Sequence, residues 1–315
     1  MAKARRMSAK PVQFISGLVV LFFLLTLSCR TSDFAASTDT TDVNHRGLYQ
    51  AIAIESAYYA GSLTVLSNTW YKDKPRVPFH FFNDNRGYLQ VDKFGHAFGA
   101  YAQSYLGYHW LKSIGVGRTN ALIFGGSLGF ILQTPIEIMD GTHEGWGFSW
   151  GDMAANAFGS ALVVGNELLF KQQLIKYKFS YWESPYSRNA NGYLGTTTMN
   201  RLLKDYNGHT YWLSMPVNRL FLKRKTPSWL NIAAGYGANG MYGEFKNIQE
   251  YNGVIIPETR RYRQYLLSLD VDWPQIKTRS KLLRTVFQGL TFIKLPFPAL
   301  EINSKGQVKG YWIYF

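Results

Sequence analysis

The first half of the chain carries apolar residues every three or four positions, which is the spacing of amphipathic and buried helices. A Pro-containing aromatic loop over 72–88 and two glycines, Gly115 and Gly117, interrupt this pattern. Four helices are predicted, over 48–71, 91–113, 119–139 and 150–173. The last two hold apolar runs of about 20 residues, which suit either a bilayer span or the centre of a bundle.

The second half alternates apolar and polar residues with a period of two, which is typical of strands. In the segment 260–273, Leu267 and Leu269 alternate with Ser268 and Asp270, so one face is apolar and one is wet. Further strands are predicted over 211–217 and 229–242, and a hairpin over 299–315 that turns at 304–306. The segment 276–293 interleaves basic and apolar residues and predicts a basic amphipathic helix.

These patterns together predict an α+β fold. A four-helix core, with a polar cluster at one end, is followed by a small antiparallel β-sheet and the basic amphipathic helix. The helical domain is placed at 47–175 and the basic β-rich region at 176–315. The last strand ends in Phe315 and resembles the closing strand of outer-membrane barrels, but five or six strands are too few for an eight-stranded barrel. A small curved sheet packed on the helices is favoured.

The N-terminus has the three parts of a secretory signal over 1–29: basic residues, an apolar stretch, and small residues before Cys29. A bacterial lipoprotein signal would make Cys29 the acylated first residue of the mature chain. Cleavage near Ala35 and an uncleaved anchor are the other two interpretations. Residues 30–46 are small and polar and are predicted to form a flexible tether. All three interpretations place the body of the protein outside the cytoplasm.

Composition narrows the class of protein. The 315 residues are 46% hydrophobic, 16% aromatic and 17% charged, which excludes a disordered chain or a coiled coil. The mean hydropathy of −0.15 is too polar for a multi-span transporter. A single cysteine excludes a disulfide framework and any thiolate zinc site.

The net charge of +14 is unevenly distributed. Residues 31–170 hold 8 Lys and Arg against 12 Asp and Glu, whereas residues 171–315 hold 21 against 8. We expect the basic half to meet an anionic membrane lipid surface, and an envelope protein is the other candidate partner. Nucleic acid is not expected as a partner, because export separates the protein from nucleic acid and the sequence contains no aromatic–basic binding motif.

Polar residues gather at the predicted helix ends. Asp92 and His96 lie one turn apart at the start of the second helix, Glu137 lies at the end of the third, and Asp152 and Asn156 lie at the start of the fourth. In an up-and-down bundle these three ends share one side, so the five side chains are predicted to converge.

Two kinds of chemistry compete for this cluster. His96, Asp92, Glu137 and Asp152 are candidate ligands of a divalent metal ion, or, with Asn156, candidate acid–base residues. The alternative is structural, since buried helix ends need caps and ion pairs. No cofactor is expected apart from such an ion.

Two local motifs are given structural interpretations. Residues 147–151 match the G-x-S-x-G pattern of hydrolases, but no strand precedes Ser149, which is better explained as the N-cap of the fourth helix with Asp152 as its capping-box partner. Residues 235–240 match G-x-G-x-x-G, but no helix follows, so glycines in a curved strand are favoured over a dinucleotide site.

The segment over about 92–165 resembles a known family. Its blocks are DKFGHAF at 92–98, SLG at 127–129, EIMDG at 137–141 and GWGFSWGD at 145–152, followed by Asn156 and Gly159. They are similar to the YfiM-like family of predicted periplasmic lipoproteins and, more weakly, to VanZ-like membrane proteins. The resemblance implies an envelope location, frequent lipid attachment and a helical core built on Asp92, His96, Glu137 and Asp152, without naming a reaction.

Two functions follow as hypotheses. The first is a non-enzymatic, lipid-anchored envelope component at the outer membrane or in the periplasm, which binds lipid or a partner protein. The second is a metal-assisted enzyme that acts on a lipid or cell-wall intermediate through Asp92, His96, Glu137 and Asp152.

Overall fold

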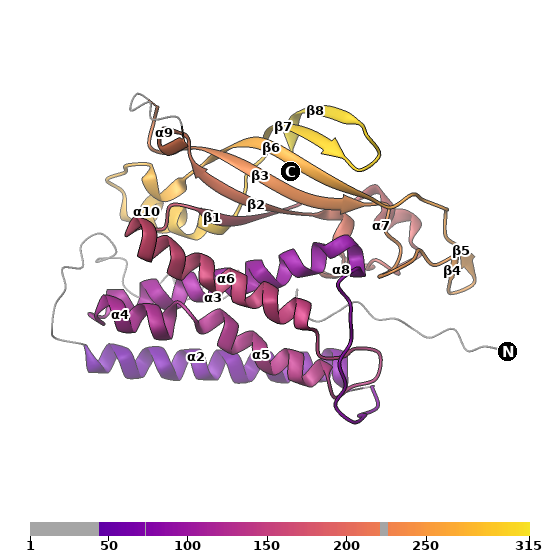
Figure 1. Ribbon diagram of the computed structural model, residues 1–315, viewed down its shortest axis with the longest axis horizontal. Coiled ribbons are helices and arrows are strands. Elements are labelled where there is room, and N and C mark those ends of the chain that lie inside the picture. Colours follow the sequence, from indigo (N-terminus) through magenta and orange to yellow (C-terminus); the bar gives the residue numbers. More distant parts are fainter. Residues whose placement is uncertain (1–43, 73, 221–225) are drawn as a thin grey trace.

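The computed structural model describes residues 44–72, 74–220 and 226–315. The predicted signal peptide 1–29, its Cys29 and all but the last residues of the predicted tether 30–46 lie outside the described residues. The predicted α+β fold is confirmed, because a layer of helices packs against one six-stranded antiparallel sheet (Figure 1).

The helical layer comes first along the chain. Its elements are α2 (His45–Leu66) with the π-helical turn η1 (Ser67–Tyr71), the 3₁₀ turn η2 (Gly87–Gln90), α3 (Val91–Ser113), α4 (Arg118–Asn120), the π-helical turn η3 (Ala121–Gly125), α5 (Leu128–Asp140) and α6 (Trp150–Phe170). In Figure 1, α3 and α6 lie next to the sheet, and α2 lies on the far side of α5.

The predicted third helix, 119–139, is present as α4, η3 and α5, which together form one helical segment over Arg118–Asp140. The π-helical turn η3 lies where two backbones come close: a Cβ atom on Gly125 would lie 2.5 Å from backbone atoms of Gly107 and Tyr108 on α3. Gly129 on α5 and Gly159 on α6 also allow close approach to α3, since added Cβ atoms would lie 2.0 and 2.1 Å from backbone oxygens of α3. The helices therefore pack at backbone contact.

The strands are β1 (Lys176–Tyr181), β2 (His209–Pro216), β3 (Leu230–Asn239), β4 (Glu250–Tyr251), β5 (Val254–Ile255), β6 (Tyr262–Val271), β7 (Phe297–Asn303) and β8 (Val308–Tyr314). The main sheet has the order β1-β2-β3-β6-β7-β8, and β4 and β5 form a separate hairpin. The short helical elements between strands are α7 (Pro185–Asn189), α8 (Thr198–Lys204), η4 (Tyr206–Gly208), α9 (Val217–Leu220), η5 (Trp273–Gln275), α10 (Lys281–Gly289) and η6 (Leu290–Phe292).

Three sequence expectations need correction here. Strand β1 was not expected, although its Lys and Ser residues alternate with aromatic ones. The fourth helix ends at Phe170 instead of 173, because Lys171 adopts a left-handed backbone conformation with φ of 54°. The basic helix is shorter than 276–293: α10 begins after Ser280, whose side chain accepts the backbone N–H of Leu283 and fixes the start.

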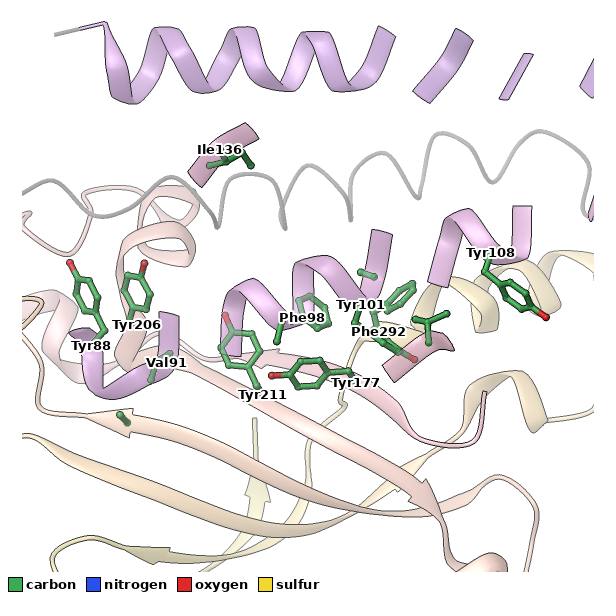
Figure 2. Close-up of a cluster of buried hydrophobic side chains, with 14 of the residues drawn as sticks. Tyr88, Val91, Phe98, Tyr101, Tyr108, Ile136, Tyr177, Tyr206, Tyr211 and Phe292 are labelled. Atoms are coloured by element: carbon green, nitrogen blue, oxygen red, sulfur yellow. The ribbon is translucent and has the colours of Figure 1, made fainter. Parts of the chain in front are cut away.

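An aromatic core joins α3 to the sheet (Figure 2). Phe94 stacks on Tyr236 with ring centroids 4.3 Å apart, and Phe98 packs on Tyr177 at 5.9 Å. The hydroxyl of Tyr177 donates to the backbone oxygen of Phe94 at 3.1 Å. This core fixes the start of α3, and with it the predicted polar cluster, against the sheet.

Two described segments, Arg118–Asp140 and Trp150–Phe170, are long and apolar enough to cross a membrane by length and composition. In the most apolar stretch of each segment, 39% and 33% of the residues, respectively, are buried. Core helices of soluble proteins can reach the same length and composition.

Candidate functional site: a buried charge cluster and an exposed sheet face

The structure brings the predicted polar side chains together at one end of the helical layer. His96 lies at the centre: its Nδ1 is 3.5 Å from Oε1 of Glu137 and 3.3 Å from Oδ1 of Asn156. Its Nε2 is 3.4 Å from Oδ1 of Asp152. All of these side chains, and Asp92 beside them, are buried. Both ring nitrogens therefore face carboxylate oxygens, and negative charge on two sides favours a cationic ring.

Lys93 adds a second cation to the cluster. Its Nζ lies 2.6 Å from Oδ1 of Asp84, 2.6 Å from Oδ1 of Asp152 and 3.4 Å from Oδ2 of Asp92. With His96 and Glu137 these residues form a chain in which negative and positive groups alternate, running from Asp84 into the core. We call the set Asp84, Asp92, Lys93, His96, Glu137, Asp152 and Asn156 the charge cluster.

Neighbouring hydroxyl groups hold the carboxylates of the charge cluster. The hydroxyl of Tyr206 donates to Oδ1 of Asp92 at 3.1 Å. Ser149 donates its Oγ–H to Oδ1 of Asp84 at 2.6 Å and accepts the backbone N–H of Asp152 at 3.2 Å. The N-cap role predicted for Ser149 is thus observed, and its hydroxyl is engaged as a donor.

A second layer adjoins Glu137. Tyr71 donates to Oδ1 of Asp140 at 2.5 Å, and burial together with the charges of Asp140 and Glu137 raises the pKa of the Tyr71 phenol well above its usual range. His143 covers this layer, with its ring 4.5 Å from that of Tyr71. The loop that carries His143 therefore closes the end of α5, while Glu144 stays exposed.

The four predicted metal ligands do not surround one point. Single ligand atoms of Asp92, His96 and Asp152 lie within 4.8 Å of one another, whereas Glu137 contacts the opposite side of the imidazole ring. Two carboxylates and an imidazole fit a divalent cation in kind. The ammonium of Lys93, however, already lies against the same Asp152 oxygen, and this favours an internal ion network.

An aromatic pocket of about 350 Å³ borders the cluster. Ser149 and Gly151 line it, and a Cβ on Gly151 would lie 3.1 Å from Cε of Lys93. Phe81 and Trp150 stack at 6.0 Å on its rim and are 60% and 68% exposed. The cluster is therefore covered, on this side, by aromatic side chains that face outward.

The main sheet has an unusual distribution of side chains. On β6, Gln264, Ser268 and Asp270 are buried, while Leu267 and Leu269 are exposed. Strand β7 repeats the arrangement with Glu301 and Asn303 buried and Leu300 and Ile302 exposed. The predicted alternation is present, but the polar side faces inward. We call the two sides the inner face, which carries Gln264 and Glu301, and the outer face, which carries Leu267 and Ile302.

The inner face is buried because the sheet curls on itself. The ring of Trp212 on β2 lies 5.9 Å from that of Tyr314 on β8, and the hydroxyls of Thr210 and Tyr314 are 3.2 Å apart. The polar groups enclosed in this way are paired. Lys178 lies 2.7 Å from Asp270, Gln264 donates to Glu301 at 2.7 Å, and Tyr311 donates to Glu301 at 2.8 Å.

One row of outer-face residues crosses all six strands in register: Phe179, Tyr211, Tyr236, Tyr265, Ile302 and Val308. Helix α3 covers the first three through Phe94 and Phe98. The last three are 51%, 52% and 65% exposed. A shallow groove of about 550 Å³ runs beside them, lined by Leu267, Leu269, Leu300 and Trp312 among others. The apolar surface that binds α3 thus continues uncovered over β6, β7 and β8.

Comparison with known proteins places the charge cluster inside a family segment. Residues 80–167, a little more than a quarter of the chain, match the model of a family described as predicted periplasmic lipoprotein (DUF2279). This match supports the predicted family of periplasmic lipoproteins and an exported protein of the cell envelope; it does not bear on the narrower likeness to YfiM or to VanZ-like proteins. No curated protein and no solved structure matches the chain.

Sequence reasoning missed three members of this site. Lys93 could have been found, because a basic residue in the same helical turn as Asp92 is the natural counter-charge for buried carboxylates. Asp84 lies in a loop and Tyr206 in the short turn η4, and neither has a periodic pattern that would place it. Their contacts with the cluster arise only from the way the loop and the sheet pack on α3.

Proposed function

We propose that this protein is an exported, non-enzymatic envelope component that contacts membrane lipid through the outer face of β6, β7 and β8. The observation that carries the proposal is the alternation of side chains on β6 and β7, in which polar residues point inward and apolar residues point outward. A sheet with one face in water normally buries its apolar side. Sheets that face lipid carry the reverse alternation, with apolar residues outward and polar residues inside.

The exposed apolar area is what lipid contact would remove from water. Leu267, Leu269 and Ile302 are each between 44% and 52% exposed, and Trp312 is 91% exposed. Burial of apolar surface contributes about 25 cal/mol per Å², so a few such side chains amount to several kcal/mol. In this proposal a lipid on Cys29 holds the chain at the outer membrane, and the outer face adds a second contact with the bilayer.

Flotation with neutral phosphatidylcholine vesicles tests the proposal. The mature chain carries Cys29→Ser, so that acylation does not contribute. We expect this protein to float, and the double variant Leu267→Glu/Ile302→Glu to lose roughly 100-fold or more in vesicle affinity, because each change removes burial and adds a charge. Val254→Glu/Ile255→Glu is the matched control, since both residues are exposed on the separate β4–β5 hairpin.

The outcome is decisive in either direction. Flotation of the parent and of the hairpin control, with loss in the sheet variant, supports lipid contact by the outer face. Equal flotation of the sheet variant, or no flotation of the parent, would refute it. Far-UV circular dichroism of each variant shows that the comparison is made on folded protein.

A second candidate function is the metal-assisted enzyme acting on a lipid or cell-wall intermediate. It is favoured by the charge balance: the charge cluster holds four carboxylates and at most two cations, Lys93 and His96. Such an excess of buried negative charge is offset either by protons or by a further cation. The aromatic pocket beside Ser149 would provide the apolar part of a substrate site.

Metal analysis of purified protein separates the two candidates. A stoichiometric divalent ion that is lost in both His96→Ala and Glu137→Ala, and kept in the exposed control His45→Ala, would support the enzyme. Absence of a stoichiometric ion from all three proteins would leave the cluster as an ion network within the bundle.

A further inference from the structure

The C-terminal end of α6 and the helix α10 lie at the same end of the molecule. Lys176, which follows α6 at the start of β1, forms an ion pair with Asp272, which precedes η5 and α10. Figure 1 shows α10 and the C-terminal end of α6 at the same end of the molecule, and the β4–β5 hairpin at the opposite end of the sheet. We call the surface formed by residues 168–171 and 277–286 the α6–α10 end.

Helix α10 is amphipathic, but its apolar side is not used to cover the sheet. No residue of α10 is buried. Leu282, Leu283 and Val286 are 71%, 46% and 42% exposed, and the ring of Phe287 packs on Trp273 at 5.7 Å. Its apolar residues remain available for another contact.

The end of α6 carries exposed apolar residues at the same end of the molecule. Leu168, Leu169 and Phe170 are 63%, 77% and 42% exposed at the point where Lys171 ends the helix. Monomeric proteins rarely leave contiguous apolar groups of this kind in water unless they bind a partner or a membrane.

The charges around this surface have one sign. The sequence 273–293 contains no Asp or Glu and four basic residues, and all four are exposed: Lys277, Arg279, Lys281 and Arg284. Two carboxylates adjoin these segments, and both are buried: Glu167 lies 4.0 Å from Arg118, and Asp272 forms an ion pair with Lys176. The exposed charges of the α6–α10 end are therefore all positive. Basic side chains interleaved with exposed Leu and Val are the pattern of helices that lie in the headgroup region of anionic bilayers.

We infer that the α6–α10 end docks on anionic phospholipid headgroups, with the leucines and Val286 reaching the acyl boundary. The inference rests on the proposed lipid contact and adds to it the class of lipid and the end of the molecule that meets the membrane surface. Each basic residue near an anionic surface contributes about 1 kcal/mol, which is roughly a five-fold change in affinity.

Vesicle binding with two lipid compositions tests this inference. The Cys29→Ser protein is titrated with phosphatidylcholine vesicles and with vesicles that also contain phosphatidylglycerol. We expect tighter binding to the anionic vesicles, and a loss of roughly 100-fold of that binding in the triple variant Lys277→Gln/Arg279→Gln/Lys281→Gln. The matched control removes three exposed charges near α7 and the β4–β5 hairpin: Arg188→Gln/Lys246→Gln/Arg260→Gln.

The outcomes distinguish this inference from the proposed function. Equal binding to both vesicle types, or equal loss of binding in the triple variant and its control, would refute headgroup docking by the α6–α10 end. Neither result would contradict the proposed lipid contact of the outer face. Binding to anionic vesicles alone, abolished in the triple variant, supports the α6–α10 end and argues against the sheet contact. The variant Leu282→Glu/Leu283→Glu tests whether these leucines reach the acyl boundary and should weaken binding to anionic vesicles. Unchanged binding in that variant would also overturn the inference.

Discussion

The substitution Lys93→Met gives the sharpest test of the charge cluster. It removes the ammonium that lies 2.6 Å from Asp84 and from Asp152, and it leaves the carboxylates in place. Methionine is unbranched and keeps most of the packing of the lysine stem, so the change acts mainly through charge. The side chain of Lys93 is 12% exposed, so solvent screens it little.

The expected loss follows from the burial of both partners. Removal of one member of a buried ion pair costs about 3–5 kcal/mol, because the remaining charge is left without compensation. Here one ammonium serves two close carboxylates, Asp84 and Asp152, and a third at 3.4 Å, Asp92. We therefore expect Lys93→Met to lower the free energy of unfolding by about 4 kcal/mol at neutral pH.

Urea unfolding followed by far-UV circular dichroism measures this loss. Lys72→Met is the control, since Lys72 is exposed and its removal should change the free energy by less than about 0.5 kcal/mol. Acidification toward the ordinary carboxyl pKa of about 4 should narrow the gap between Lys93→Met and the parent, because protonated carboxyl groups no longer need the ammonium.

A loss for Lys93→Met no larger than that of Lys72→Met would show that the alternating chain of charges contributes no stability. A variant that keeps its stability and takes up a stoichiometric divalent cation would show instead that the carboxylates form a metal site. Either result would refute the ion-network interpretation.

Three further predictions concern stability. Burial lowers the pKa of His109 and of His209 to about 4 from 6.5, so the unfolded chain binds more protons between these values. The free energy of unfolding should be level above pH 6.5 and fall by about 2 kcal/mol per histidine by about pH 5, and a flat urea profile would contradict this. Burial also lowers the pKa of Lys294 to about 8 from 10.5, so stability should rise from pH 8 to 10.5, and Lys294→Met should remove that rise when the two proteins are unfolded side by side. Gly129→Ala should lower the free energy of unfolding by about 3 kcal/mol or more, and with it the melting temperature, since its Cβ would lie 2.0 Å from a backbone oxygen of α3. Gly165→Ala has open space around the new Cβ and should raise the free energy of unfolding by about 0.5–1 kcal/mol. Equal melting temperatures of the two variants would count against backbone contact between α5 and α3.

The sequence was enough to predict that Asp92, His96, Glu137, Asp152 and Asn156 converge, because local sequence signals mark where each helix begins and ends. The apolar spacing, the glycines and the cap at Ser149 fix where each helix begins and ends. Since the connections are short, the start of α3, the end of α5 and the start of α6 must meet, and His96 then lies between Glu137 and Asp152. The α+β class was equally visible, because the period of apolar residues is helical in the first half of the chain and alternating in the second half.

What a sequence pattern leaves open is the direction in which an alternating strand faces. In β6 the period of two is the same whether Leu267 or Ser268 points inward, and only the curl of the sheet and the position of α3 decide it. Asp84 joined the cluster for a similar reason, since a loop contact across 65 residues, such as Ser149 with Asp84, has no local signature. Local propensity therefore determined the elements and their ends, whereas the tertiary packing determined which side of the sheet is buried and which loop carboxylate joins the cluster.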